Sequence, residues 1–486
     1  MTSFLWHDYE TTGADSRRDR PVQFAAIRTT LDLERVGDPL MLFCAPAADT
    51  LMHPEACLIT GITPQQALRE GVNEAQFAAR VHEVMIEPGT CTVGYNSLRF
   101  DDEFTRHMLY RNFYDPYERE WKDGNSRWDL IDLARMCYAL RPDGIDWPLR
   151  EDGSPSFRLE DLARANRLDQ ARAHDALSDV EALIGLARLI RVRQPRLFEF
   201  HFALRRKQKV FELLDVARMT PLVHVSSRYP ANRGCLAVIA PLAAHPTQPN
   251  GVIVFDLGTD PGPLLELDAD EIADRVFTPR ADLPEDVERI ALKAIHANRS
   301  PALAPLSALK GIDHGRIALD LDQCLANLER LRASDGLATK LQRVFGNAQP
   351  HAASLDPELA LYSDFIPDAD KRRLREVRSA TPQQLGDSNI QFTDARYKEL
   401  LFRYRARNWP ESLDADANAQ WAAFCRDKLS KPTPTTSLTL PDYFALIAQL
   451  RKQRTDSANQ ALLDALEAFG HDKARSLDIA ESNPLF

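Results

Sequence analysis

The chain has 486 residues, of which 44% are hydrophobic and 27% are charged. This composition excludes a disordered protein, and the length exceeds what one hydrophobic core normally serves, so two or three domains are expected. The net charge of −11 excludes a uniformly basic surface, but basic clusters at 188–196, 205–209, 371–378 and 396–407 leave room for local contacts with phosphates.

The seven cysteines are scattered along the chain and form no C-x-x-C pair. This argues against a disulfide framework and a zinc knuckle, and favours a reducing compartment. The N-terminus has no basic, apolar leader, and no later run approaches the roughly 18 apolar residues needed to span a bilayer. We therefore expect a soluble, cytoplasmic protein.

The first part of the chain alternates between strand and helix patterns. Strands are predicted at 4–10, 23–30, 41–44 and 90–95, and helices at 73–85, 103–113, 130–140, 159–166 and 176–191. Alternation of this kind is typical of a sheet covered by helices, which predicts an α/β domain over residues 1–195.

Two further domains are expected after this point. Short strands at 221–225, 235–239 and 251–256, with a helix at 321–332, predict a β-rich domain over 196–348. Helical patterns at 397–407, 420–429, 441–454 and 459–469 predict an all-α domain over 349–486.

The first chemical motif is Asp8-x-Glu10 at the end of the first predicted strand. Residues i and i+2 of a strand point to the same face, so the two carboxylates lie side by side. Carboxylate oxygens are the ligands that Mg²⁺ prefers. Taken alone, the motif is better explained as a solvated strand end.

A second group of acids, Asp101, Asp102 and Glu103, follows an apolar strand and opens a helix. An Asp at the N-cap and acids in the first turn stabilise a helix by about 0.5–2 kcal/mol. Capping accounts for one acid and does not require all three. One of them, Asp101 by its position, is therefore free to face a site.

The third element is His174-x4-Asp179. Five residues turn a helix by about 140°, so His174 is expected in the turn before the helix, with Asp175 as N-cap. Asp179 then lies beside an apolar stripe, where a metal ion would compensate its charge. Four carboxylates and one imidazole together indicate a two-metal site that hydrolyses phosphodiesters.

The order Asp-x-Glu, Asp, His-x4-Asp resembles the DEDD superfamily of 3′→5′ exonucleases, in the branch that uses His, since position 175 is Asp rather than Tyr. More narrowly, the chain resembles bacterial exonuclease I in segments 4–11, 94–103, 155–160, 173–180, 221–226 and 400–408. The resemblance implies a monomer with an RNase H-like exonuclease domain, an SH3-like β-barrel domain and an all-α C-terminal domain. It also implies a groove for single-stranded DNA and a role in DNA repair and recombination.

Metal chemistry at these positions predicts the role of each residue. Asp8, Glu10 and Asp179 are expected to hold two Mg²⁺ ions, or Mn²⁺ in their place, with Asp8 bridging them. Asp101 is expected to hold the second ion through water. His174 is expected to deprotonate the attacking water, and Glu10 also contacts the substrate. The product is a 5′-mononucleotide, and the 3′→5′ polarity is implied by the resemblance.

Further substrate contacts are predicted outside the metal site. The resemblance implies that Arg158 contacts the nucleotide in the active site. Arg106, Tyr117, Trp121 and Trp128 interleave basic and aromatic side chains, as platforms for unpaired nucleotides do. Core packing explains Trp128 equally well.

The resemblance also implies a protein partner, the acidic C-terminal tail of single-stranded-DNA-binding protein. Arg141 and Arg316 fall where the basic residues of the tail pocket are expected. Phe200 stands where the family pattern has Tyr, so this pocket lacks one hydroxyl.

Two other functions compete with a DNA exonuclease. An RNA-directed member of the same superfamily is one, but such enzymes are short single-domain chains, and the residues after Arg196 would go unexplained. A non-catalytic scaffold that binds single strands is the other. Loss of a metal ligand would favour it, and all five site residues are present.

Overall fold

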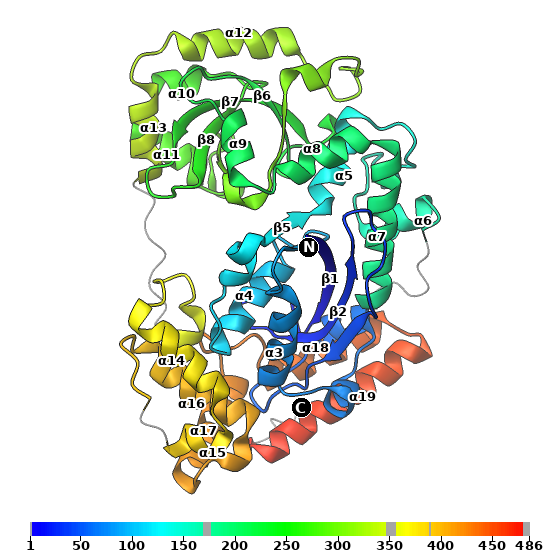
Figure 1. The fold of residues 1–486 in the computed structure, drawn as a ribbon, viewed down its shortest axis with the longest axis vertical. Helices are drawn as coiled ribbons and strands as arrows, with labels where there is room; N and C mark the ends of the chain where they lie inside the picture. The colour runs from blue at the N-terminus through cyan, green and yellow to red at the C-terminus, as the bar shows by residue number, and fades with distance from the viewer. Residues whose placement is uncertain (1, 169–175, 347–355, 388–389, 480–486) are drawn as a thin grey trace. The chain divides into compact units, whose positions relative to one another are not determined.

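The computed structural model describes residues 2–168, 176–346, 356–387 and 390–479 (Figure 1). The chain forms two compact units. The first unit contains 1–125, 171–181 and 352–486, and the second contains 126–170 and 182–351.

The first unit is built on a sheet whose strands run in the order β3-β2-β1-β4. The predicted strands are confirmed, with bounds of β1 (Ser3–Thr11), β2 (Pro21–Thr29), β3 (Leu40–Phe43) and β4 (Thr90–Gly94). β1 pairs antiparallel with β2 and parallel with β4. The register shifts between Glu10 and Thr11, and an irregularity of this kind re-aims side chains at the end of a strand.

The N-terminal segment also contains helices. They are α1 (Pro54–Thr60), α2 (Pro64–Glu70), α3 (Glu74–Met85) and α4 (Asp101–Arg111). Asn73 caps α3 by accepting a hydrogen bond from the backbone N–H of Gln76. Phe77 on α3 and Met108 on α4 share a core with Phe24 of β2, so both helices pack against the sheet.

Helix α4 begins two residues before its predicted start at 103 and ends at Arg111, before the predicted end at 113. Three acids in its first turn favour the early start, because carboxylates stabilise a helix N-terminus. Phe113 has a φ of 62°, in the left-handed region, where a helix cannot continue. The N-cap is Phe100, with no side-chain cap bond, so the expected capping by an aspartate is wrong.

The C-terminal segment adds helices to the first unit. They are α14 (Asp368–Ser379), α15 (Pro382–Asp387), α16 (Arg396–Asn408), α17 (Ala415–Ser430), α18 (Leu440–Gln453) and α19 (Ser457–Ser476). The four helices predicted here are confirmed, each with a longer span or shifted ends. Their apolar faces form a core with α1 and α2 through Cys57, Ile62 and Ala67.

The second unit holds β5 (Ser126–Asp129), α5 (Leu130–Leu140), α6 (Leu159–Ala165), α8 (Pro195–Ala203) and α9 (Lys207–Leu213). Helix α7 (Ala176–Arg193) has its first residues in the first unit and the rest in the second. The helices predicted at 130–140, 159–166 and 176–191 are therefore confirmed to within two residues.

An antiparallel sheet of order β10-β6-β7-β8-β9 follows in the second unit. Its strands are β6 (Leu222–Val225), β7 (Leu236–Ala244), β8 (Gly251–Asp256), β9 (Leu292–His296) and β10 (Ala302–Pro305). Sequence patterns identified the first three and missed β9 and β10, which are short and each flanked by a 3-10 turn. Around the sheet lie α10 (Gly262–Glu266), α11 (Ala269–Phe277), α12 (Leu321–Arg332) and α13 (Leu337–Gly346).

Two expectations from composition can be compared with the structure. All seven cysteines are free and buried. In the part of the chain that the structure describes, no helix combines the length and apolar character needed to cross a bilayer.

Candidate metal centre

Three carboxylates meet where β1 ends. Asp8 and Glu10 come from the strand, and Asp179 comes from the first turn of α7. One oxygen from each side chain lies within 4.8 Å of the other two. The predicted set of direct metal ligands is therefore brought together by the fold.

The two faces of β1 have different chemistry because side chains alternate along a strand. Asp8 and Glu10 share the face that carries the acidic cluster. His7 and Tyr9 share the opposite face and are 1% and 4% exposed. The ring of Tyr9 packs on Phe24 with centroids 4.8 Å apart, which anchors the strand to the core.

Asp101 is a fourth carboxylate close enough to the cluster to act on the charge of Asp8. Burial raises the pKa of the Asp8 carboxyl well above its usual range. The negative charges of its neighbours raise this pKa further, in the descending order Asp101, Glu10 and Asp179. Four converging carboxylates repel one another, and divalent cations relieve that repulsion directly. Among the residues that the structure describes, the donors of this cluster are all carboxylate oxygens, which suit Mg²⁺ or Mn²⁺.

Asp102 and Glu103, which follow Asp101 in α4, are engaged by side chains outside the acidic cluster. Asp102 accepts a 2.5 Å hydrogen bond from Nη2 of Arg119, and both side chains are buried. Glu103 accepts hydrogen bonds from Arg106 and from the Tyr362 hydroxyl. Of the three acids that open α4, Asp101 is thus the one that acts on Asp8 most strongly.

His174 and Asp175 lie outside the described residues, so the expected base is not placed by the structure. Arg158 precedes α6 in the second unit. Its side chain is 72% exposed and pairs with Glu160 at 3.6 Å.

The predicted nucleotide contacts differ in burial. Arg106 is 7% exposed and is held by Glu120 through Nε at 2.7 Å and Nη2 at 3.0 Å. Its guanidinium lies over the ring of Tyr117, 5.4 Å from the centroid, so it supports that ring. Trp121 is 65% exposed. Trp128 is fully buried and donates from Nε1 to His201, which confirms the core-packing interpretation.

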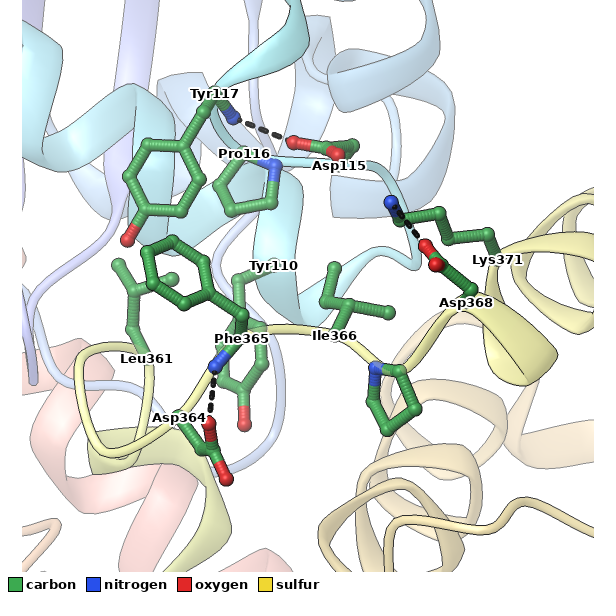
Figure 2. A pocket seen from close by; sticks show the side chains of 11 residues that line it. Tyr110, Asp115, Pro116, Tyr117, Leu361, Asp364, Phe365, Ile366, Asp368 and Lys371 are labelled. Atoms are coloured by element: carbon green, nitrogen blue, oxygen red, sulfur yellow. Dashed lines mark hydrogen bonds and ion pairs between the residues drawn. The ribbon is translucent and has the colours of Figure 1, made fainter.

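A pocket of about 540 Å³ lies beside Tyr117 (Figure 2). One wall comes from the segment after α4 and the other from the loop before α14. Phe365 projects from this loop, is 82% exposed, and meets the Tyr117 ring at a centroid distance of 6.4 Å. Sequence reasoning missed Tyr362 and Phe365. Their signal is two aromatics three residues apart in a short segment that ends in Pro367.

A second pocket, of about 500 Å³, lies in the second unit. Its lining is largely apolar and contains two arginines: Arg141, Gln194, Pro195, Arg196, Leu197, Phe200, Ala304, Pro305, Ser307 and Ala308. Arg141 and Phe200 therefore face one cavity, as predicted. Arg316 is not among the lining residues, because its Nη2 donates to the Ala139 carbonyl and its guanidinium covers the Tyr138 ring. Sequence reasoning did not identify Arg196.

Acids on a strand that converge with an acid on a helix are the arrangement expected of a metal-dependent nuclease, and Asp8, Glu10 and Asp179 have it. Family models agree with this class along the chain. The model described as "Exonuclease" matches residues 5–187, "Exonuclease I SH3-like domain" matches 205–347, and "Exonuclease I C-terminal domain" matches 355–473.

Known relatives and solved structures assign the chain to one family within this class of nucleases. Exodeoxyribonuclease I of Escherichia coli is 44% identical over 472 residues, which cover 97% of this chain and 98% of that protein. The structure of exonuclease I from Methylocaldum szegediense has a TM-score of 0.93 at 48% identity, covering 99% of this chain and all of that one. This chain belongs to the exonuclease I family.

Several related structures contain ligands. E. coli exonuclease I in complex with a dA16 oligonucleotide has a TM-score of 0.93 at 44% identity and covers 97% of this chain and 100% of its own. A zinc-bound form of the E. coli complex with single-stranded DNA has a TM-score of 0.92 at the same identity, covering 98% and 100%. A structure of SSB and exonuclease I with an inhibitor has a TM-score of 0.89 at 43% identity, covering 97% and 100%.

Proposed function

We propose that this protein is a 3′→5′ exodeoxyribonuclease that degrades single-stranded DNA to 5′-mononucleotides. The observation that carries the proposal is the convergence of Asp8, Glu10 and Asp179 at the end of β1, with Asp101 acting on Asp8. Near full-length identity of 44% to exodeoxyribonuclease I supplies the substrate and the polarity. The acidic cluster by itself fixes neither. DNA repair and recombination are the processes that use this activity.

The acidic residues are the proposed metal ligands. Asp8, Glu10 and Asp179 hold two Mg²⁺ ions, or Mn²⁺ in their place, and Asp101 contributes through water. When bound, such ions neutralise the charge of the scissile phosphate and activate a water molecule for in-line attack. The three ligand carboxylates are half-buried and are carried by β1 and α7, which keeps the ligand oxygens in place before substrate arrives.

The remaining roles belong to groups that move protons or hold the strand. His174 takes the proton of the attacking water, because imidazole is the side chain that most often acts as a general base. Glu10 and Arg158 orient the terminal nucleotide. Phe365 presents an exposed ring to an unpaired base, since stacking on aromatics is the usual recognition of single strands. The half-buried ring of Tyr117 lies against it.

The pocket lined by Arg141, Arg196 and Phe200 is the proposed docking site for the acidic C-terminal tail of single-stranded-DNA-binding protein. Two arginines beside an apolar surface suit a tail that ends in a hydrophobic residue with a free carboxylate. A relative in complex with SSB supports this partner.

Three further assignments complete the proposal. The protein acts as a monomer in the cytoplasm, and its seven free, buried cysteines suit a reducing compartment. The proposed domains are 1–195, 196–348 and 349–486, a division supported by the three ranges that the family models match, 5–187, 205–347 and 355–473. Light scattering of the purified chain, eluted from a sizing column, tests the oligomeric state.

Digestion of a 5′-labelled oligonucleotide tests the activity. Single-stranded DNA, its duplex and its RNA counterpart are each incubated with Mg²⁺ or EDTA, using the wild type and Asp179→Asn. We expect a metal-dependent ladder that shortens from the 3′ end of single-stranded DNA and is absent with the variant. Preferential cutting of RNA would contradict the substrate. Binding without cutting would indicate the scaffold function instead.

A further inference from the structure

The buried face of β1 contains a hydroxyl pair directly behind the acidic cluster. Tyr9 lies between Asp8 and Glu10 in the strand and is 4% exposed. Its hydroxyl lies 3.1 Å from Oγ1 of Thr105, which is fully buried in the second turn of α4. The strand that carries two of the acids is thus linked by side chains to the helix that carries Asp101.

The hydrogen-bond directions follow from counting protons. Thr105 Oγ1 donates to the main-chain carbonyl of Asp101 at 2.8 Å. A threonine hydroxyl has one proton and a carbonyl only accepts, so the Tyr9 hydroxyl is the donor in the Tyr9–Thr105 pair. The bonds form a relay from Tyr9 through Thr105 to the backbone of Asp101.

Both ends of this relay are held rigidly. Phe24 packs against the Tyr9 ring and fixes its direction. At the other end, Arg119 is 0% exposed and pairs with Asp102, the residue after Asp101. Successive helical residues diverge by about 100°, so this ion pair also determines the direction in which Asp101 points.

We propose that Tyr9 and Thr105 are positioning residues that fix the separation between Asp101 and the Asp8–Glu10 pair, and thereby set the affinity of the acidic cluster for divalent cations. The inference rests on the proposed metal centre and adds to it residues that touch neither metal nor substrate. Four carboxylates without a cation repel each other and push α4 away from β1, and the buried relay resists that separation. Ligands held in place before binding lose less freedom when the ion enters.

Calorimetric titration of Mn²⁺ into the full-length protein without DNA tests the relay. Tyr9→Phe keeps the ring and removes the donor, and Thr105→Val keeps the shape and removes both bonds. We expect each to weaken Mn²⁺ binding about 10-fold, the lower end of what supporting residues contribute in metal sites. Thr105→Ser keeps the hydroxyl and should bind like the wild type. The double variant Tyr9→Phe with Thr105→Val should be no weaker than Thr105→Val.

Tyr443→Phe is the matched control. Tyr443 is fully buried in the first unit and donates to the carbonyl of Leu466 at 3.0 Å. It belongs to the core formed by α18 and α19, which contains none of the acidic residues. Removal of the Tyr443 hydroxyl should lower the unfolding temperature about as much as Tyr9→Phe does and leave Mn²⁺ affinity unchanged. A general loss of stability is thereby separated from a loss of metal affinity.

The outcomes distinguish the relay from the metal centre. If the wild type binds Mn²⁺ and both relay variants stay within about twofold of it, the relay is overturned while the metal centre stands. The relay is also overturned if Tyr443→Phe or Thr105→Ser weakens Mn²⁺ binding as much as Tyr9→Phe and Thr105→Val do. If the wild type binds no Mn²⁺, the proposed metal centre fails and the relay fails with it. Should Tyr9→Phe not fold, the comparison of Thr105→Val with Thr105→Ser decides.

Discussion

Arg407 of α16 and Asp49 form a two-point ion pair in the interior of the first unit, although 358 residues separate them in the chain. Nε and Nη2 of the arginine donate to the two carboxylate oxygens at 3.1 and 2.9 Å. Lys428 also donates to Asp49, at 2.8 Å, and Glu358 accepts a further bond from Arg407. This cluster joins the C-terminal helices to the loop after β3.

Breaking the pair should destabilise the protein strongly. Arg407→Met leaves Asp49 and Glu358 buried with fewer positive partners. Removal of one member of a buried ion pair costs about 3–5 kcal/mol, so we expect a large fall in the thermal unfolding midpoint. Arg69→Met removes an exposed pair with Glu70 and should leave the midpoint unchanged. Equal midpoints for both variants would show that the buried cluster contributes little.

The same cluster predicts how stability depends on acid. Burial by itself would raise the pKa of Asp49, but Arg407 and Lys428 hold it well below its usual range. A lowered carboxyl pKa contributes stability that is complete above the unfolded value near 4 and is lost as the pH falls toward the folded value. Thermal midpoints should therefore drop steeply below about pH 4. The thermal midpoint of Asp49→Asn should be lower than that of the wild type at neutral pH and should fall less as the pH drops below about 4. An equally steep fall in the variant would show that Asp49 is not the group responsible.

Asp179→Asn should abolish metal-dependent cleavage while leaving the fold intact. The substitution removes one ligand charge from the acidic cluster and preserves its size. We expect a loss of activity of more than about 100-fold, since even supporting residues contribute 10- to 100-fold in metal sites. Steady-state release of mononucleotides measures it. Asp335→Asn, at an exposed turn between α12 and α13, is the matched acid-to-amide control and should retain activity.

Phe365→Ala should weaken binding of single-stranded DNA. The side chain is 82% exposed and borders the pocket beside Tyr117. Loss of one base stack costs about 1–3 kcal/mol, and fluorescence anisotropy of a labelled oligonucleotide in EDTA measures it. Ile59→Ala removes an apolar side chain that is also exposed, in α1, and should not change the affinity. The stacking role is wrong if the two variants bind alike.

Arg196→Ala and Arg141→Ala should each weaken binding of an acidic peptide with a free C-terminus. Hydrogen bonds to charged groups contribute about 1.5–3 kcal/mol, and the loss should shrink at high salt because Arg196 is exposed. Arg218→Ala is the control, since this exposed arginine of the second unit does not line the pocket. Arg316→Ala is informative too: a larger effect than that of Arg196→Ala would restore the assignment made from sequence.

The sequence by itself determined the local arrangement of the acids. A strand period of two placed Asp8 and Glu10 on one face, and the helix period placed Asp179 in the first turn of α7. Most strands and helices also followed from their periodic patterns, because such patterns depend on neighbours in the chain. β9 and β10 were missed because they contain Ala, Lys and Pro, residue types that are depleted in strands, whereas the equally short β3 and β6 do not.

Tertiary structure decided which side chains face the site. The family resemblance singles out Asp101 among the three acids that open α4, and the structure gives the reason, because Arg119 engages Asp102 and Tyr362 engages Glu103. Arg106 and Trp128 match a nucleotide-binding pattern, yet one is engaged by Glu120 and the other is buried. Phe365 and Arg196 were identified only from the structure, in which each lines a pocket. The physical reason is that these outcomes depend on partners remote in the chain, and a local pattern contains no information about them.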